Sequence, residues 1–253
     1  MISVTVTNQK GGVSKTTTAH AMGAALARRG YRVLFVDLDP QGNLSHGLQA
    51  SAGLSAFELL TKSATVADVI QKTEQGEVIP ASAGLSAADV ILSTVTGKEY
   101  RLREALEPVQ AFYDFAIIDT PPALGALTVN AMTAADILVI PAMADVFSLQ
   151  GIGQLADTIQ TVRRYCNPGL KLGGVLLTRH SGRTILSRDM AELIGRTAEQ
   201  LGTTVYKTRV RECVALKEAQ ASRESIFQYA PRSNAAKDYE AFTLEFLEGL
   251  NHG

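Results

Sequence analysis

The sequence contains few of the residues that build disulfide frameworks, zinc sites or membrane spans. Only two cysteines occur among its 253 residues, Cys166 and Cys213, and they form no C-x-x-C pair. This argues against a disulfide framework and against a zinc site. No apolar run approaches the roughly 20 residues that a membrane-spanning helix needs. The first residues already predict a strand, which leaves no room for a signal peptide. We therefore expect a cytoplasmic protein without a membrane partner.

The chain as a whole also lacks an excess of charge of either sign. It carries 24 lysines and arginines against 25 aspartates and glutamates, a formal net charge of −1. Such a balance does not by itself indicate a polyanionic partner. With 46% hydrophobic and 19% charged residues, the composition is that of an ordinary globular protein. We expect residues 1–253 to form a single α/β domain.

The most informative stretch is a glycine-bearing loop at residues 8–17, N-Q-K-G-G-V-S-K-T-T. Alternating apolar and hydroxyl side chains over residues 2–7 predict a strand before it. Apolar residues at helical spacing over residues 18–29 predict a helix after it. A loop in this position turns backbone N–H groups inward, and the helix N-terminus adds partial positive charge. We therefore expect a phosphate-binding loop in which Lys15 reaches the β- and γ-phosphates and Thr16 holds Mg²⁺.

Strands alternate with helices along the rest of the chain. Strands are predicted over residues 31–37, 77–81, 115–119, 137–141, 172–178 and 203–207. The strand at 77–81 is expected at a sheet edge because it contains Pro80. Helices are predicted over residues 54–60, 65–70, 98–106, 150–164, 185–201 and 233–250, with 98–106 exposed. This order predicts an α/β fold with a doubly wound, mostly parallel sheet and helices on both faces.

Carboxylates follow two of these strands. Asp37 and Asp39 lie in D-L-D-P-Q-G-N, and Asp119 begins D-T-P-P. The carboxyl ends of parallel strands border the crevice in which ligands bind, so these side chains are expected near the loop. Phosphoryl transfer to water needs a metal ion, a residue that orients the water, and neutralisation of the γ-phosphate. A single aspartate here is equally well explained as a helix cap or a turn residue. Three motifs in this order favour a nucleotide site.

The motifs K-G-G-x-x-K-T-T, D-x-D-P-Q-G-N and D-T-P-P resemble those of the ParA/MinD family of deviant Walker A ATPases. The loop departs from G-x-x-x-x-G-K-[ST] at Gln9 and Ser14, and the family tolerates a residue other than glycine at the second position. Several segments between residues 174 and 239 are similar to the chromosome-partitioning (ParA/Soj) branch. The resemblance covers nearly the whole chain and implies a P-loop NTPase fold that uses ATP and Mg²⁺.

The resemblance also implies roles for individual residues. Lys10, the signature lysine, is expected to cross a dimer interface to the partner's nucleotide. Asp39 is expected to position the attacking water and to share the Mg²⁺ site with Thr16, while Asp119 binds Mg²⁺ through a water. Asp37 is a weaker candidate for the metal shell. The family's adenine sequence I-P-R-N is replaced at residues 210–213 by V-R-E-C. The implied nucleotide contacts are Gly11, Gly12, Val13, Ser14, Lys15, Thr16, Thr17, Thr178, Arg211 and Glu212.

The activity implied by the resemblance is ATP-dependent DNA partitioning. A homodimer held by ATP would bind nonspecific DNA at the nucleoid and hydrolyse ATP slowly until a ParB-like partner stimulates it. No N-terminal DNA-reading module is expected. Residues 163–223 carry twelve basic and five acidic residues, which predicts a basic surface for phosphate contacts. Solvated surface helices give the same pattern. Arg183 matches a DNA-binding position of the family, and Arg209 and Lys217 are candidates for an altered second position.

Four other functions share parts of this pattern. A MinD-like membrane-positioning ATPase needs a basic amphipathic C-terminal helix, whereas residues 240–249 are acidic. A nitrogenase-type iron protein needs cluster-binding cysteines after the second aspartate motif, and Cys166 and Cys213 do not fall there. A metabolic ligase or small-molecule kinase would turn over its substrate without DNA. A nucleotide-binding scaffold without hydrolysis is expected to lack Asp39.

Overall fold

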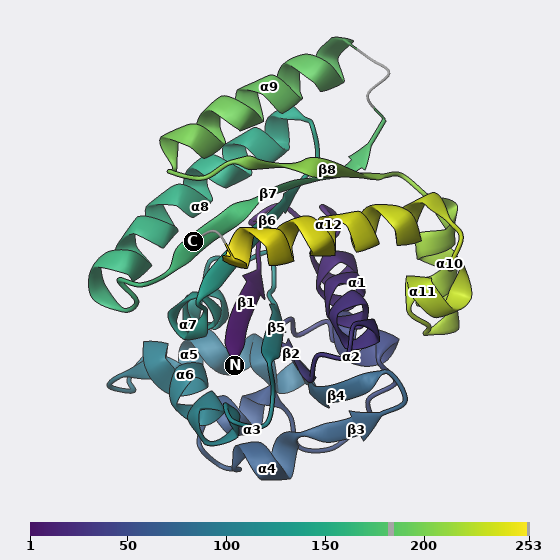
Figure 1. The fold of residues 1–253 in the computed structure, drawn as a ribbon. Helices are drawn as coiled ribbons and strands as arrows, with labels where there is room; N and C mark the ends of the chain where they lie inside the picture. Colours follow the sequence, from purple (N-terminus) through teal and green to yellow (C-terminus); the bar gives the residue numbers. More distant parts are fainter. Residues whose placement is uncertain (182–184, 252–253) are drawn as a thin grey trace.

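The structure, a computed structural model, describes residues 1–181 and 185–251 and is built around an eight-stranded sheet (Figure 1). The strand order is β3-β4-β2-β5-β1-β6-β7-β8, and the described pairs are parallel except for β3 with β4. The strands are β1 (Ile2–Val6), β2 (Val33–Asp37), β3 (Gln71–Thr73), β4 (Gly76–Ile79), β5 (Phe115–Asp119), β6 (Ile137–Ala142), β7 (Lys171–His180) and β8 (Val205–Arg211).

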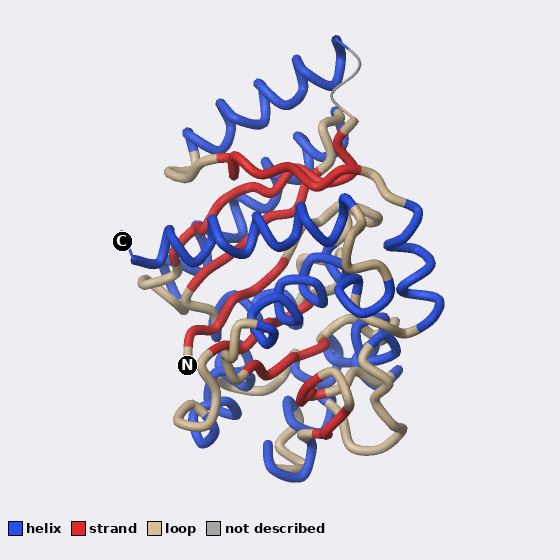
Figure 2. The backbone as a smooth tube through the Cα atoms, turned by 45° about the vertical axis from the view of Figure 1, so that its right-hand side comes forward, coloured by secondary structure: helices blue, strands red, loops and turns tan. Residues whose placement is uncertain are grey.

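Helices cover both faces of this sheet, as Figure 2 shows. The α-helices are α1 (Lys15–Arg28), α2 (Asn43–Gly47), α3 (Ala56–Leu60), α4 (Val66–Val69), α5 (Ala88–Leu92), α6 (Arg101–Leu106), α7 (Ala126–Ala134), α8 (Val146–Tyr165), α9 (Ile185–Gln200), α10 (Val214–Ser222), α11 (Ile226–Tyr229) and α12 (Asn234–Asn251). Short 3₁₀ turns are η1 (Ala83–Ala87), η2 (Lys98–Tyr100) and η3 (Glu107–Val109). The predicted doubly wound, mostly parallel architecture is confirmed.

Successive side chains of the central strands are buried on opposite faces of the sheet. In β6, Val139 joins the apolar cluster that contains α1 and α12 residues, whereas Leu138 and Ile140 join the cluster formed with α8 and α9. A strand that is buried on both faces has no polar face, which explains the continuous apolar runs in the sequence. The core therefore lies in two layers, one on each side of the sheet.

The register of β1, β2 and β5 places three strand ends side by side. Val6 of β1 is paired with Asp119 of β5, and Asp119 is paired on its other side with Asp37 of β2. Helix α1 begins at Lys15, beyond the end of β1. The loop and the aspartates that lie far apart in the sequence therefore meet at one edge of the sheet.

The last helix, α12, covers the edge of the sheet formed by β8. Strand β8 is the terminal strand, and its backbone N–H groups at Lys207 and Thr208 donate to the Glu245 carboxylate of α12, at 2.6 and 2.9 Å. Farther along, the Arg211 N–H donates to Asp238, also of α12, at 3.0 Å. Carboxylates thus replace the acceptors that another strand would supply, and the edge is covered rather than free to pair.

Three predictions about individual elements were wrong. Strand β4 is not the edge, because the antiparallel β3, which was not predicted, lies outside it. Residues 98–106 form the 3₁₀ turn η2 and then α6, whose Leu102 and Leu106 are buried rather than exposed. Strand β8 begins two residues later than predicted and extends to Arg211, where it pairs with β7.

We predict that Glu245→Ala lowers the free energy of unfolding by about 2 kcal/mol, because two backbone N–H groups lose a charged acceptor. Glu248→Ala removes an exposed carboxylate from the same helix, is expected to change stability by less than about 0.5 kcal/mol, and serves as the control. Chemical denaturation of both variants measures the difference. Equal stability of the two variants would contradict the role assigned to Glu245.

Candidate functional site

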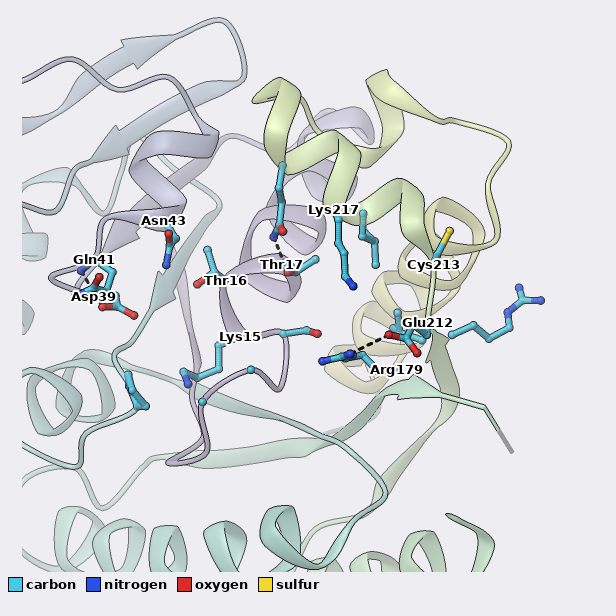
Figure 3. A pocket seen from close by; sticks show the side chains of 18 residues that line it. Lys15, Thr16, Thr17, Asp39, Gln41, Asn43, Arg179, Glu212, Cys213 and Lys217 are labelled. Carbon is cyan, nitrogen blue, oxygen red and sulfur yellow. Dashed lines mark hydrogen bonds and ion pairs between the residues drawn. The ribbon is translucent and has the colours of Figure 1, made fainter. Parts of the chain in front are cut away.

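A cavity of about 380 Å³ opens at the carboxyl edge of the sheet (Figure 3). The phosphate loop and the start of α1 form one wall through Gly11, Gly12 and residues 14–17. Asp39, Gln41, Asn43 and Pro122 lie at one end, and residues 210–213 with Arg179 line another part. Helix α10 completes the wall with Leu216, Lys217 and Gln220. Segments far apart in the sequence therefore enclose a single elongated site.

Two residues of the phosphate loop adopt the left-handed conformation. Gly12 has φ +77°, and a Cβ atom there would meet no neighbour, so its backbone conformation rather than space favours glycine. Ser14 has φ 67° and ψ 32°, although it carries a side chain, and it caps α1 without a side-chain hydrogen bond. Ser14 therefore adopts a backbone conformation that glycine usually adopts, at a conformational cost of about 1 kcal/mol.

Buried side chains beneath the loop hold it on the sheet. The Asn8 amide donates from Nδ2 to the Pro141 carbonyl at 2.8 Å, and its Oδ1 accepts from the Lys10 N–H at 3.1 Å. The Thr178 hydroxyl donates to the Val13 carbonyl at 3.1 Å. Thr178 therefore supports the loop from below. It was expected to contact the nucleotide, but it is not among the residues that line the cavity. Asn8 is fully buried; the sequence placed it in the loop but assigned its side chain no role.

Lys15 occupies the position expected of the phosphate-binding lysine. It lines the cavity, is only 7% exposed, and its Nζ donates to the Lys10 carbonyl at 3.1 Å. Burial lowers the pKa of the ammonium, while the nearby carboxylates of Asp119 and Asp39 act in the opposite direction. A buried cation between a loop of backbone N–H groups and two carboxylates is suited to bind anionic phosphate oxygens.

Asp119 provides the feature that fits a metal ion. Its side chain is fully buried, and burial together with the neighbouring Asp37 raises its pKa well above the usual value. Oδ1 accepts from the Thr120 N–H at 3.1 Å, whereas Oδ2 has no hydrogen-bond partner among the described residues. An unpaired buried carboxylate oxygen close to Thr16 is suited to hold Mg²⁺ or a water bound to it. The residues present therefore fit the expected metal.

Asp37 and Asp39 have different surroundings. The Asp37 carboxylate accepts from the Ser45 N–H and hydroxyl and from the Asp39 N–H, at 2.8, 2.7 and 3.1 Å. Burial raises the pKa of Asp37 to about 6. Asp37 therefore holds the start of α2 and the backbone of Asp39. Asp39 lines the cavity, and its Oδ1 accepts from the Gln41 N–H at 3.0 Å, which fixes the orientation of the carboxylate.

Lys10 points away from the cavity of its own chain. Its Nζ forms an ion pair with Asp145, the N-cap residue of α8, and lies 5.7 Å from the centre of the Phe147 ring. Lys10 is not among the residues that line the cavity. Its side chain thus does not assist chemistry in its own site in this structure, and the expected role across a dimer interface stays a prediction.

The candidate adenine residues are present but already paired. Arg211 lines the cavity, and its guanidinium donates to both carboxylate oxygens of Asp238, at 2.9 and 2.6 Å. Glu212 also lines it and accepts from Arg179 at 2.8 Å (Figure 3). Arg179 was not identified from the sequence, because an arginine at the end of β7 carries no local signal. These two ion pairs leave little net charge on this part of the cavity wall.

The three residues predicted to contact DNA lie in different places. Lys217 lines the nucleotide cavity instead of standing apart from it. Arg209 is exposed on β8, where its Nη1 donates to His180 Nε2 at 3.1 Å. Arg183 lies outside the described residues. The structure therefore leaves Arg209 as the described candidate on the outer surface.

The described residues contain neither a membrane-spanning helix nor a metal-binding cluster of side chains. Over residues 1–181 and 185–251, no helix combines the length and the apolar character needed to cross a membrane. Within the same ranges, no group of three or more histidine, cysteine or acidic side chains is arranged to hold a metal ion. A Mg²⁺ ion at Thr16 and Asp119 would thus need further oxygen ligands, which nucleotide phosphates and waters commonly supply.

Comparison with known proteins agrees with this geometry. The family model described as "AAA domain" matches residues 1–172. The sporulation initiation inhibitor protein Soj of Bacillus subtilis is 42% identical over 241 residues, which covers 93% of this chain and 94% of that protein. The chromosome partitioning protein ParA of Caulobacter vibrioides (strain NA1000 / CB15N) is 40% identical over 249 residues, covering 96% of this chain and 92% of that protein. This chain belongs to the ParA/Soj family of partitioning ATPases.

A solved structure extends the comparison to ligands. The cobyrinic acid a,c-diamide synthase of Mycobacterium smegmatis, solved with an ATP analogue and magnesium, is 33% identical. The match covers 99% of this chain and 96% of that one, with a TM-score of 0.86. The predicted resemblance to ParA/Soj ATPases and the P-loop NTPase fold are both confirmed.

We predict that Ser14→Gly raises the free energy of unfolding by about 0.5–1 kcal/mol. Glycine relieves the left-handed strain, which outweighs the added freedom of the unfolded chain. Ser222→Gly, at an exposed helical position of α10, is the control and is expected to lower stability by a similar amount. Thermal unfolding without nucleotide compares the two, and destabilisation by both would contradict the strain assigned to Ser14.

Proposed function

We propose that this protein is an ATP-dependent DNA-partitioning ATPase. It binds ATP with Mg²⁺, hydrolyses ATP to ADP and phosphate, forms a homodimer while ATP is bound, and binds nonspecific DNA as that dimer. The observation that supports this most is the placement of Lys10. The cavity is lined by Lys15, Thr16 and Asp39, whereas Lys10, the first lysine of the loop, is directed outside it.

The cavity residues support the separate requirements of phosphoryl transfer to water. Lys15 places a cation against the terminal phosphates, and the N–H groups of residues 11–17 bind their oxygens. Thr16 and Asp119 would hold Mg²⁺, which neutralises negative charge on the phosphoryl oxygens. Asp39 accepts a hydrogen bond from the attacking water and orients it. No side chain has to form a covalent bond, so positioning and charge account for the chemistry.

The surroundings of Lys10 support the dimer. Its partner Asp145 precedes Val146 and Phe147, which are 49% and 69% exposed. Exposed apolar side chains beside a cation are suited to contact with a second copy. When Lys10 moves from Asp145 to the partner's phosphates, one ionic contact replaces another. ATP then stabilises the dimer because it contacts both subunits, and hydrolysis removes that contact.

Exposed cations support the DNA part. Lys207 and Arg209 are two positions apart on β8, and both are exposed. Arg188 and Arg196 are exposed on α9. Contacts of this kind bind the phosphate backbone without reading sequence. A relative named as a chromosome partitioning protein favours a ParB-like protein as the activating partner, and a cytoplasmic, nucleoid-associated location follows from such a role.

A second candidate function comes from the solved structure named cobyrinic acid a,c-diamide synthase. On that basis the same fold would activate a small carboxylic acid, and ATP turnover would depend on that substrate rather than on DNA. A MinD-like or other cargo-positioning ATPase would instead act at a membrane or a protein assembly. The exposed basic residues of β8 and α9 favour DNA over both.

The test measures binding to a nonspecific DNA duplex with ATP, with ADP and without nucleotide, at two salt concentrations. We expect binding only with ATP, weakened by about tenfold or more between roughly 50 and 200 mM salt. Lys10→Ala is expected to abolish DNA binding while ATP still binds, because only the dimer is lost. Lys72→Ala, an exposed lysine on the opposite edge strand, is the matched control and is expected to bind DNA normally.

Absence of DNA binding under all conditions, with ATP still hydrolysed, would contradict the DNA part of the proposal. Stimulation of hydrolysis by a small carboxylic acid but not by DNA would favour the ligase function. DNA binding that is equal in Lys10→Ala and the unaltered protein would contradict the role of the dimer.

A further inference from the structure

We propose that Lys217 of α10 is a phosphate ligand of the bound nucleotide, so that α10 forms a second cationic wall opposite the phosphate loop. This rests on the proposed binding of ATP and adds a contact that the loop motif does not contain. The helix was not predicted from the sequence, and Lys217 was expected to face DNA.

One face of α10 is turned toward the cavity. Cys213, Leu216, Lys217 and Gln220 all line it, and their spacing of three, four and seven residues places them on one side of a helix. Figure 3 shows the Lys217 side chain extending between Thr17 and Arg179. Val214, which is off this spacing, is 67% exposed. The cavity-facing side of α10 thus carries its functional groups.

Hydrogen bonds fix this helix to the nucleotide site. The Gln220 amide donates to the Thr17 hydroxyl at 2.8 Å. Thr17 lies in the first turn of α1, where unpaired N–H groups and the helix dipole favour an anion. Gln220 therefore ties α10 to the anion-binding end of α1, and Lys217 lies almost one turn away on the same face.

A second contact anchors the same, C-terminal end of α10. Arg223, its C-cap residue, donates from Nε to His46 Nε2 at 3.1 Å, and its carbonyl accepts from the Gln49 amide at 3.0 Å. His46 belongs to α2, which begins four residues after Asp39. Anchors at Gln220 and Arg223 hold the C-terminal end of α10 against α1 and α2, which gives Lys217, one turn earlier, a fixed support, as a binding residue requires.

Lys217 is the cation of the cavity without a partner. Lys15 donates to a backbone carbonyl, Arg179 is paired with Glu212, and Arg211 is paired with Asp238. Among the described residues, no hydrogen bond or ion pair engages the Lys217 ammonium, although its charge lowers the pKa of Glu212. An unpaired ammonium that faces an anion-binding helix end is available for a charge-assisted hydrogen bond to phosphate.

The order of residues along the cavity suggests which phosphate it contacts. In Figure 3, Asp39, the residue expected to orient the water, lies toward one side of the cavity and Cys213 toward the other. Cys213 and Val210 both line the cavity and offer an apolar wall suited to a base. Lys217 and Thr17 lie between these two sides, whereas Lys15 and Thr16 serve the terminal phosphates. We therefore assign Lys217 to the phosphate next to the ribose.

Calorimetric affinities for ATP, ADP, AMP and adenosine, measured with Mg²⁺ and without DNA, test this assignment. Lys217→Ala is expected to weaken ATP, ADP and AMP by about tenfold, the size expected for one charged hydrogen bond, and to leave adenosine within about twofold. Lys217→Arg keeps the charge and is expected to recover most of the affinity. Lys237→Ala, an exposed lysine of α12, is the matched control and is expected to bind all four ligands normally.

Unchanged affinity of Lys217→Ala for all three phosphorylated ligands would overturn the assignment, as would an equal loss for adenosine. Unfolding midpoints of the variants are measured alongside, and an exposed lysine is expected to leave them unchanged. Failure of the unaltered protein to bind any nucleotide would overturn the proposed function as well. Absence of DNA binding alone would leave the test of Lys217 intact.

Discussion

The buried hydrogen bonds beneath the phosphate loop are the constraint on which the site depends. Asn8 fastens the loop to β6 through the Pro141 carbonyl, and Thr178 fastens it to β7 through the Val13 carbonyl. Between these anchors the backbone turns sharply enough to force Ser14 into the left-handed conformation. Strain of this kind persists only where the surrounding structure fixes the chain. The direction of the loop N–H groups, and with it the position of Lys15, follows from those anchors.

The second constraint is the concentration of negative charge at the strand ends. Strand register places Asp37 beside Asp119, and burial raises the pKa of both carboxyls. Asp37 is satisfied by Ser45, while Asp119 keeps one oxygen unpaired. A site built in this way is incomplete without a cation. Mg²⁺ bound with a nucleotide would supply one at Thr16 and Asp119.

Much of this arrangement was predictable because its signals are local. The strand–loop–helix pattern around Lys15 and the apolar strand that ends at Asp119 each identify their own element, and the parallel sheet follows from their alternation. The rest depends on contacts between distant segments. No local sequence pattern predicts that Thr178 lies beneath Val13, or that Lys217 lies opposite Thr17. The assignment of β4 to an edge failed for the same reason, since β3 is too short to show periodicity.

The claim that ATP joins two copies of this chain through Lys10 is tested most directly by measuring the molecular mass of the protein in solution. Sedimentation velocity of the Asp39→Ala variant, which is expected to bind ATP without hydrolysing it, is measured with ATP, with ADP and without nucleotide. The account predicts a doubling of mass with ATP alone and a monomer under all conditions once Lys10→Ala is added. A protein that binds ATP and remains a monomer, or a dimer that persists without Lys10, would contradict it.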